Sequence, residues 1–497
     1  MIDNEARERR ISINEKGRTN VKKSIVILTA IFMIIVTACS HSSNGNGGEA
    51  ITSTTEKEES LTKKERNETS SSNNTEKKTI VLSTFYHENF FLEAKKRYEA
   101  KYPHITIDVQ YVESTDADGE AKLEKYEKTI GTALLSGKGP DLIEMDHLPT
   151  ESYVNKKLLV DLGTMMDHDD TFNRDDYFNN ILEGIQVNGG LYGIPMGFFV
   201  YALVGNETMI EKSGVTVDDS HWNWSQFANI TKEISKTVNG GASGLGVGGS
   251  AGIIPGDFKV SQYVSEFVND QYATFVEQES GKANFESTAF IDLLKEVKRL
   301  VDEKVIDPAA NNVLFRETQI NSPGDYVRVL KQSQYYSNNA DYRSKLYLRP
   351  NGSGQEAGGY FRTYQMVGLN AKSEVKEEAW HFLKFMISEE MKDVASSSGF
   401  PLNKKSYASI AEKALEKGKV ESDQTIGPLK GVIYDITKQD IDDLEKFLVN
   451  AKYPVQYKES KINDIITEES HAYFTGQKSP EEVAGLIQNR VTTVLNE

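Results

Sequence analysis

The sequence predicts an α/β fold on a mostly parallel sheet, because strand-like and helix-like segments alternate near its start. Residues 79–84 are β-rich, 89–101 have helical periodicity, and 104–111 alternate apolar and polar side chains. A helical stretch at 123–135 is followed by the apolar run 141–145. Strand, helix, strand, helix, strand at this spacing is typical of βαβ units. Later helices are expected at 258–270, 286–303, 375–398, 406–417, 438–451 and 458–496.

Length, charge and cysteine content exclude several classes of protein. The 497 residues are enough for about two to four domains. A formal net charge of −17 argues against a nucleic-acid partner, whose phosphates require a basic surface. The single cysteine, Cys39, cannot build a disulfide framework or a zinc site. No cofactor is expected.

The N-terminal 38 residues have the features of an export signal. Lys22 and Lys23 precede an apolar run at 25–38, which is too short for a hydrocarbon layer of about 30 Å. Residues 36–39 resemble the bacterial lipobox, which implies cleavage before Cys39 and attachment of lipid to its sulfur. The alternative is a plain membrane anchor or a buried helix with a cysteine nearby by chance.

A polar segment at 39–78 separates this signal from the first predicted strand. It is rich in Ser, Thr, Asn, Gly, Glu and Lys and has almost nothing to bury, so it is expected to stay disordered. A flexible coil of this length spans roughly 35 Å. The segment therefore suits a tether between a lipid on the outer face of the cell membrane and a folded domain, as at a Gram-positive surface.

Seven short motifs follow one another along the rest of the chain. They occupy residues 139–146, 158–162, 188–195, 201–206, 222–227, 379–385 and 399–401. Together they resemble the pattern of family 1 extracellular solute-binding proteins of the carbohydrate type, and the resemblance covers essentially all of 79–497. Two positions depart from the family pattern, which has Asn-Lys-Asp at 206–208 and tryptophan near Tyr360 and Phe361.

This resemblance implies a two-lobed fold of the type II periplasmic-binding-protein kind. Crossovers are expected near 195–201 and 336–341. Lobe 1 would hold 79–195 and 341–390, lobe 2 would hold 196–340, and 391–497 would complete lobe 2. Such a protein, expected to be a monomer, closes around a small ligand and delivers it to ABC permease subunits. A sugar or oligosaccharide is favoured, and a peptide, polyol, polyamine or phosphorylated compound remains open.

Candidate ligand contacts lie at the ends of predicted strands and on the crossovers. Aromatic faces pack on the C–H faces of a sugar, while polar groups bond its hydroxyls. The candidates are Tyr86, His87, Glu88, Asp146, Phe198, Phe199, Tyr201, Tyr336, Asp341, Tyr360 and Arg362. Alternation along 198–201 allows at most two of its aromatic residues in the site. The alternatives are a helix cap for Asp146 and a surface salt bridge for Arg362.

The catalytic motifs in the sequence are incomplete, and an enzyme is not expected. Residues 248–252 fit G-x-S-x-G but lack the strand and helix of a nucleophile elbow. The acidic run 167–170 is expected to be an exposed turn and not a metal site. Thiaminase I shares the two-lobed fold but uses a catalytic cysteine, and here Cys39 is assigned to the lipid. A receptor lipoprotein coupled to a sensor kinase is the other alternative.

Overall fold

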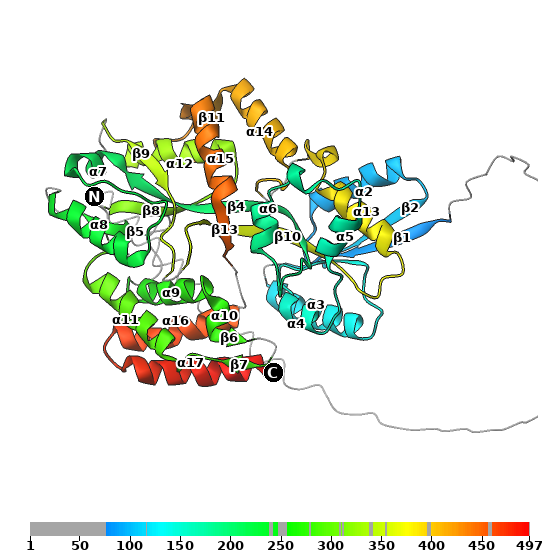
Figure 1. Cartoon of the computed structure of the whole chain (residues 1–497), viewed down its shortest axis with the longest axis horizontal. Coiled ribbons are helices and arrows are strands. Elements are labelled where there is room, and N and C mark those ends of the chain that lie inside the picture. The colour runs from blue at the N-terminus through cyan, green and yellow to red at the C-terminus, as the bar shows by residue number, and fades with distance from the viewer. Residues whose placement is uncertain are drawn as a thin grey trace, which may run out of the picture. The chain divides into compact units, whose positions relative to one another are not determined.

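The computed structural model describes residues 76–496, with gaps at 116, 238–241, 247–255, 278–279, 308–309, 311–312, 337–340, 353–354, 395–398 and 456–459. The predicted signal peptide, Cys39 and most of the predicted tether lie outside the described residues. The chain divides at Ser72, and the unit that begins at Asn73 is described below (Figure 1).

One large sheet organises the second unit, with the strand order β2-β1-β3-β10-β4-β8-β5. In addition, β13 pairs with β10 and β9 pairs with β4. The strands are β1 (Lys78–Ser83), β2 (Ile105–Gln110), β3 (Leu142–Glu144), β4 (Ile194–Asn206), β5 (Ser243–Gly246), β8 (Val313–Ile320), β9 (Ser344–Tyr347), β10 (Gly359–Leu369) and β13 (Ala451–Pro454).

The predicted βαβ units are confirmed, and the sheet as a whole is mixed instead of mostly parallel. Strand β1 pairs in parallel with β2 and with β3, through the helices α2 (Asn89–Lys101) and α3 (Gly119–Leu135). The long strands β4 and β10 run antiparallel to each other, and β4 is also antiparallel to β8 and β9. Local periodicity identified the first group of strands, whereas the pairing of β4 with β10 joins segments about 160 residues apart.

The strand β4 includes residues 195–201, where the first crossover is predicted. Tyr336 ends helix α12 (Pro323–Tyr336), and residues 337–340 are not described, so the second crossover, at 336–341, stays a prediction. The strand β10 pairs with β4 from Val367 to Tyr360 and lies beside it in the middle of Figure 1.

Two large hydrophobic clusters form the core, and β4 contributes to both. Phe198 belongs to the first cluster, with side chains of β1, β2, α2 and α13 (Lys376–Met386). Leu203 belongs to the second, with side chains of α8 (Trp224–Thr237), α9 (Gly256–Asn269), α11 (Thr288–Asp302), α16 (Ser460–Phe474) and α17 (Pro480–Leu495). A strand shared between two cores is suited to connect two lobes.

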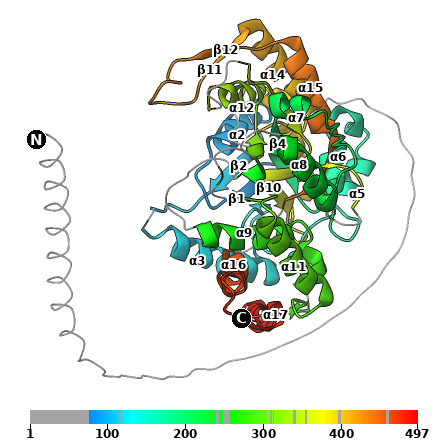
Figure 2. The same cartoon turned by 90° about the vertical axis from the view of Figure 1, so that its left-hand side faces the viewer.

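The C-terminal helices divide between these two cores. Helices α14 (Lys404–Lys417) and α15 (Lys438–Asn450) contact α12 and contribute Ala411 and Leu444 to the first cluster. Helices α16 and α17 contact α9 and α11 in the second. Figure 2 shows the two groups at its top and bottom. The predicted lobe boundaries at 195, 340 and 390 remain predictions.

Local signals explain where several helices begin and end. Ser479 and Glu482 form a capping box at the start of α17, and Thr437 and Asp440 form one at α15. Gly418 ends α14 with φ +61°. Further elements are α4 (Thr150–Asn155), α5 (Leu162–His168), α6 (Asn179–Gly184), α7 (Glu207–Ser213), α10 (Tyr272–Phe275), β6 (Val276–Glu277), β7 (Lys282–Ala283), β11 (Lys419–Glu421) and β12 (Ile433–Asp435). Among the described residues, no helix combines the length and apolarity needed to cross a membrane.

Candidate ligand-binding site

One face of the adjoining strands β8, β4 and β10 carries a row of polar and aromatic side chains. Directly opposite residues of antiparallel strands share a face, and alternate residues of one strand do as well. Tyr201 lies opposite both Gln319 of β8 and Tyr360 of β10, and Phe199 lies opposite Arg362. We call this surface the floor; its side chains are Phe199, Tyr201, Glu317, Gln319, Tyr360, Arg362 and Tyr364.

Contacts between a guanidinium group and aromatic rings fix the side chains at the centre of the floor. The Arg362 guanidinium lies 5.9 Å from the centroid of the Phe199 ring. That ring meets the Tyr201 ring edge-on, with centroids 5.9 Å apart. Tyr201 and Arg362 are half-buried, so each keeps surface that a ligand can contact. The floor combines apolar faces with hydrogen-bonding groups, as small-molecule sites do.

The loops that follow β1 and β3 form a first wall at the Tyr364 end of the floor. The rings of Tyr86 and His147 lie 5.7 Å apart, and Tyr86 is 44% exposed. Glu88 precedes α2 but does not cap it; its side chain bonds Gln365 of β10 instead. Burial raises the pKa of Glu88. The wall thus places an accessible aromatic face beside carboxylates.

Asp146 holds the backbone of β10 in place. Its two carboxylate oxygens accept hydrogen bonds from the backbone N–H of Gln365 at 2.7 Å and of Met366 at 2.9 Å. Gln365 is only 2% exposed and has a left-handed φ of +52°, which a non-glycine residue adopts only when its surroundings impose it. Asp146 is therefore a positioning residue for the strand that carries Arg362 and Tyr364.

A second buried carboxylate lies beside Asp146. Glu144 accepts hydrogen bonds from Thr84 Oγ1 at 3.3 Å and from the backbone N–H of Asp146 at 3.1 Å. Burial, followed by the charge of Asp146, raises the pKa of Glu144 to about 8. Burial also raises the pKa of Asp146. The two neighbouring acids behind the first wall therefore do not both ionise at neutral pH.

Arg349 builds a second wall at the Tyr360 end of the floor. Its guanidinium bonds Asp270, which directly follows α9, at 2.6 Å and approaches Glu317 of β8 at 3.2 Å. The same group lies 4.9 Å from the Tyr360 ring and 5.8 Å from the Trp224 ring. Arg349 is 4% exposed, so one buried cation ties together α8, α9, β8 and β10.

Glu266 on α9 completes this second wall. Solvent reaches its side chain, yet burial raises its pKa to about 8, with Glu317 as the next cause. Glu266 is thus an exposed carboxylate of α9 that interacts with the buried Arg349 and Asp270. Burial similarly raises the pKa values of Glu317 and Asp270, against the opposing charge of Arg349.

The structure brings together most of the candidates predicted from the sequence. Tyr86, His87, Glu88 and Asp146 lie at the first wall, where the His87 ring meets the Tyr111 ring at 4.5 Å. The floor includes the predicted Phe199, Tyr201 and Arg362. Tyr360 also belongs to the floor, but it is 1% exposed and lies beneath Arg349.

Three candidates lie elsewhere or outside the described side chains. Phe198 is fully buried in the first cluster, because alternation along β4 turns it to the face opposite Phe199. Asp341 lies beside α7, where its backbone carbonyl accepts a hydrogen bond from Thr208 Oγ1 at 2.9 Å. The side chain of Tyr336 is not among those described.

Sequence reasoning missed the second wall and part of the floor. The missed residues are Glu266, Asp270, Glu317, Arg349 and Tyr364. One signal was available for Glu317, because polar residues from 316 to 319 follow the apolar run 313–315 within a single strand. An ionisable residue in a predicted strand between apolar segments suggests a site. The convergence of α9 and Arg349 on that strand has no comparable local signal.

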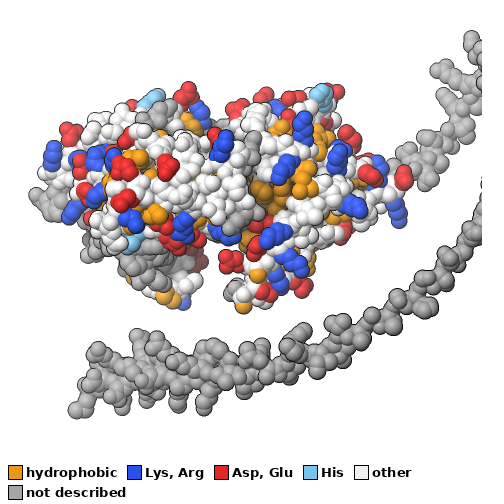
Figure 3. Space-filling view, turned by 90° about the horizontal axis from the view of Figure 1, so that it is seen from below, with side chains coloured by type: hydrophobic (Ala, Val, Ile, Leu, Met, Phe, Trp, Pro, Cys, Tyr) orange, Lys and Arg blue, Asp and Glu red, His pale blue; other side chains and the backbone are white. Residues whose placement is uncertain are grey.

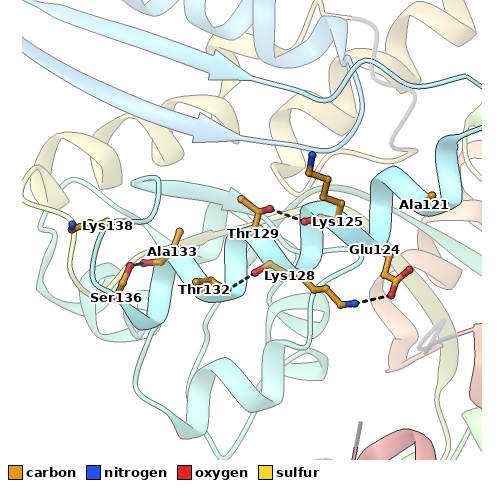
Figure 4. A pocket seen from close by; sticks show the side chains of 9 residues that line it. All are labelled: Ala121, Glu124, Lys125, Lys128, Thr129, Thr132, Ala133, Ser136 and Lys138. Carbon is orange, nitrogen blue, oxygen red and sulfur yellow. Dashed lines mark hydrogen bonds and ion pairs between the residues drawn. The ribbon is translucent and has the colours of Figure 1, made fainter. Parts of the chain in front are cut away.

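A surface hollow lies along α3, away from the floor (Figure 4). It is open to solvent and lined only by α3 and the short segment after it. Lys128 in this hollow is paired with Glu124 at 2.8 Å. Because a single helix encloses little of a ligand, this surface is a poorer candidate binding site than the floor and its two walls.

The other motifs weighed in the sequence do not form sites among the described residues. Asp169 of the acidic run 167–170 pairs with Lys384 at 2.5 Å and accepts a hydrogen bond from Trp380. No cluster of three or more potential metal ligands is found in the described part of the chain. The G-x-S-x-G segment at 248–252 lies outside the described residues.

The fold and site define a protein of the solute-binding class. Residues 86–393 match the sequence model of the family described as bacterial extracellular solute-binding protein, and the chain belongs to this family. A protein of Brucella abortus (strain 2308) described as a binding protein is 21% identical over 402 residues, which are 79% of this chain and 87% of that one.

Solved structures show the same fold. A family 1 extracellular solute-binding protein from Alicyclobacillus acidocaldarius has a TM-score of 0.53 and 17% identity, covering 84% of this chain and 98% of that one. A periplasmic oligogalacturonide binding protein from Yersinia enterocolitica has a TM-score of 0.54 and 13% identity, covering 84% and 99%. A sugar transporter from Rhizobium etli, in an open conformation, has a TM-score of 0.51 and 15% identity, covering 83% and 98%. The predicted two-lobed, periplasmic-binding-protein-like fold is thereby confirmed.

Proposed function

We propose that the protein captures a sugar or oligosaccharide on the floor and delivers it to an ABC importer. The floor itself is the observation that carries the proposal. It presents the accessible rings of Tyr201 and Tyr364 beside Arg362 and Glu317, so that aromatic faces and hydrogen-bonding groups lie on one surface. The sugar transporter and the oligogalacturonide binding protein that share the fold add support for a carbohydrate.

The arrangement of the walls suits capture by hinge closure. The first wall follows strands of the first core cluster, and the second wall is built on α9 and β8, which pack in the second. A ligand that touches both walls stabilises the state in which they are closest, in proportion to the contacts it gains there. β4 and β10 carry the floor between them and are the elements that have to bend.

A thermal-shift screen of the whole chain tests the carbohydrate assignment. A sugar that binds only the native protein at about 100 times its Kd adds about 2.7 kcal/mol to the free energy of unfolding. For a protein of this size the midpoint rises by a few degrees. Arg362→Ala is expected to abolish the rise in the midpoint. Arg343→Ala, which removes a mostly exposed guanidinium that pairs with Glu211 of α7, is the control. A clear response to amino acids or peptides and to no sugar contradicts the assignment.

We further propose that Cys39 carries a lipid that anchors the protein at the outer face of the cell membrane. Residues 36–39 support this proposal, because they resemble a lipobox directly after an apolar run. Cys39→Ser is expected to move the protein from the membrane fraction to the medium and to abolish incorporation of radioactive palmitate. Continued labelling and membrane retention of the serine variant would rule out this anchor. Ser40→Ala is the matched control.

A further inference from the structure

The floor and walls hold more negative than positive groups. Three carboxylates interact with Arg349 at the second wall. Near the first wall Asp146 interacts with Arg362, and Glu88 and Glu144 lie close to Asp146. The carboxylates are Glu88, Glu144, Asp146, Glu266, Asp270 and Glu317. Over the face that Figure 3 presents, Lys and Arg side chains are interspersed with Asp and Glu. The whole chain has a formal net charge of −17, so the site shares the negative sign of the protein.

The second wall has the clearest imbalance. Arg349 bonds Asp270 at 2.6 Å and Glu317 at 3.2 Å, so its single charge already serves two carboxylates. Glu266, which is exposed on α9, is a third carboxylate and interacts with Glu317, Arg349 and Asp270. Its pKa of about 8 means that the unliganded protein holds a proton there at neutral pH. A cationic group of a ligand can take the place of that proton.

Among its described residues, the first wall has no positive side chain that could balance the carboxylates of the second wall. Burial lowers the pKa of His147, so this imidazole is neutral at neutral pH. Arg362 lies against the Phe199 ring and near Asp146. The exposed Tyr86 ring and the half-buried Tyr364 ring stand at this wall, and aromatic faces attract ammonium groups. Carboxylates with aromatic faces on one surface are suited to bind an amine.

We propose that this site, within the function proposed above, takes a carbohydrate that bears a protonated amine and rejects acidic carbohydrates. An ammonium group donates three hydrogen bonds and offsets the excess charge at Glu266 and Glu317. A neutral hydroxyl donates one bond and leaves the excess in place. A carboxylate or phosphate adds to it. The oligogalacturonide binding protein shares the fold, and its named ligand is an acidic sugar of the kind that this charge distribution opposes.

Matched sugars test the preference for an amine. The whole chain is titrated calorimetrically with glucosamine, galactosamine and mannosamine, with their neutral parents and uronic acids, and with β-1,4-linked oligomers of glucosamine, N-acetylglucosamine and glucose. The amine of the responding series is expected to bind about tenfold tighter than its neutral partner. A neutral or acidic member that binds as well overturns the charge preference and leaves carbohydrate capture standing. Binding of spermidine without any sugar overturns carbohydrate capture and leaves the preference for positive charge. No response to any of these ligands overturns both.

Variants of the second wall locate the preference. Glu266→Gln and Glu317→Gln are each expected to reduce the tenfold ratio between amine and neutral sugar toward one. The unliganded Glu266→Gln protein is expected to melt no lower than the parent at neutral pH, because glutamine resembles the protonated, uncharged form of Glu266. Glu412→Gln, at an exposed position of α14, is the matched control and should keep the ratio. An unchanged ratio in both wall variants refutes this location.

Discussion

Replacing Arg349 by methionine is expected to lower the free energy of unfolding at neutral pH by about 3–5 kcal/mol, because it leaves buried carboxylates without their cation. Asp270 loses a bond of 2.6 Å and Glu317 a contact of 3.2 Å. Methionine fills much of the same volume, so the loss reports charge more than packing. The rings of Tyr360 and Trp224 also lose a stacked guanidinium.

The pH dependence of this loss distinguishes charge from packing. Without Arg349 the pKa values of Asp270 and Glu317, already raised by burial, rise further in the folded protein. A raised folded-state pKa stabilises the protein below the unfolded pKa, and that stability is lost as the pH rises through the folded value. Denaturant unfolding at pH 5 and pH 8 should therefore show the larger deficit at pH 8.

Two comparisons make the Arg349 experiment decisive. Arg343→Met removes a mostly exposed guanidinium that pairs with Glu211, and it should cost less than about 1 kcal/mol. Adding Asp270→Asn to Arg349→Met should recover part of the lost free energy of unfolding, because it removes one of the buried carboxylates that no longer has a cation. Equal losses for Arg349→Met and Arg343→Met, independent of pH, would show that the buried ion cluster does not stabilise the fold.

Replacing Asp146 by alanine is expected to cost about 2–4 kcal/mol. The backbone N–H groups of Gln365 and Met366 lose their acceptors, and an unsatisfied buried donor costs about 1–3 kcal/mol. The left-handed φ of Gln365 also loses the contact that holds it. Because Arg362 and Tyr364 lie on the same strand, a sugar that binds the parent should bind this variant more weakly.

Asparagine at position 146 separates the two hydrogen bonds from the charge. It keeps one oxygen acceptor, so about half of the alanine loss is expected in urea unfolding. Asp218→Ala, which removes an acceptor for the Ser220 N–H in an exposed loop, should cost little because water replaces it. If Asp146→Ala is as stable as Asp218→Ala, Asp146 does not position β10.

The fold could be predicted from the sequence where local patterns were strong. The helix predicted at 89–101 coincides with α2, and the one predicted at 123–135 lies within α3. The pairing of β10 with β4 could not be predicted in this way, because it joins segments that are far apart in the sequence. Such a pairing depends on tertiary contacts and has no periodic signature within the strand itself.

The candidate site could be predicted only where it follows local chain features. Glu88 lies in the loop after β1, and Asp146 lies in the loop after β3. Both could be predicted because ligands of α/β sheets generally bind at the ends of strands. Phe198 was included because the residues alone did not fix which face of β4 is buried. Arg349 and Glu266 meet Glu317 from distant parts of the chain, and only the folded structure brings their charges together.

The first core is completed by segments that are far apart in the sequence. Strand β1 finds its strand partners early, since it pairs with β2 and β3. Its Lys78, however, pairs with Glu378 of α13, about 300 residues later. Contacts of such long sequence separation slow folding. The packing of β1 against α13 is therefore expected to form only after most of the chain has been synthesised.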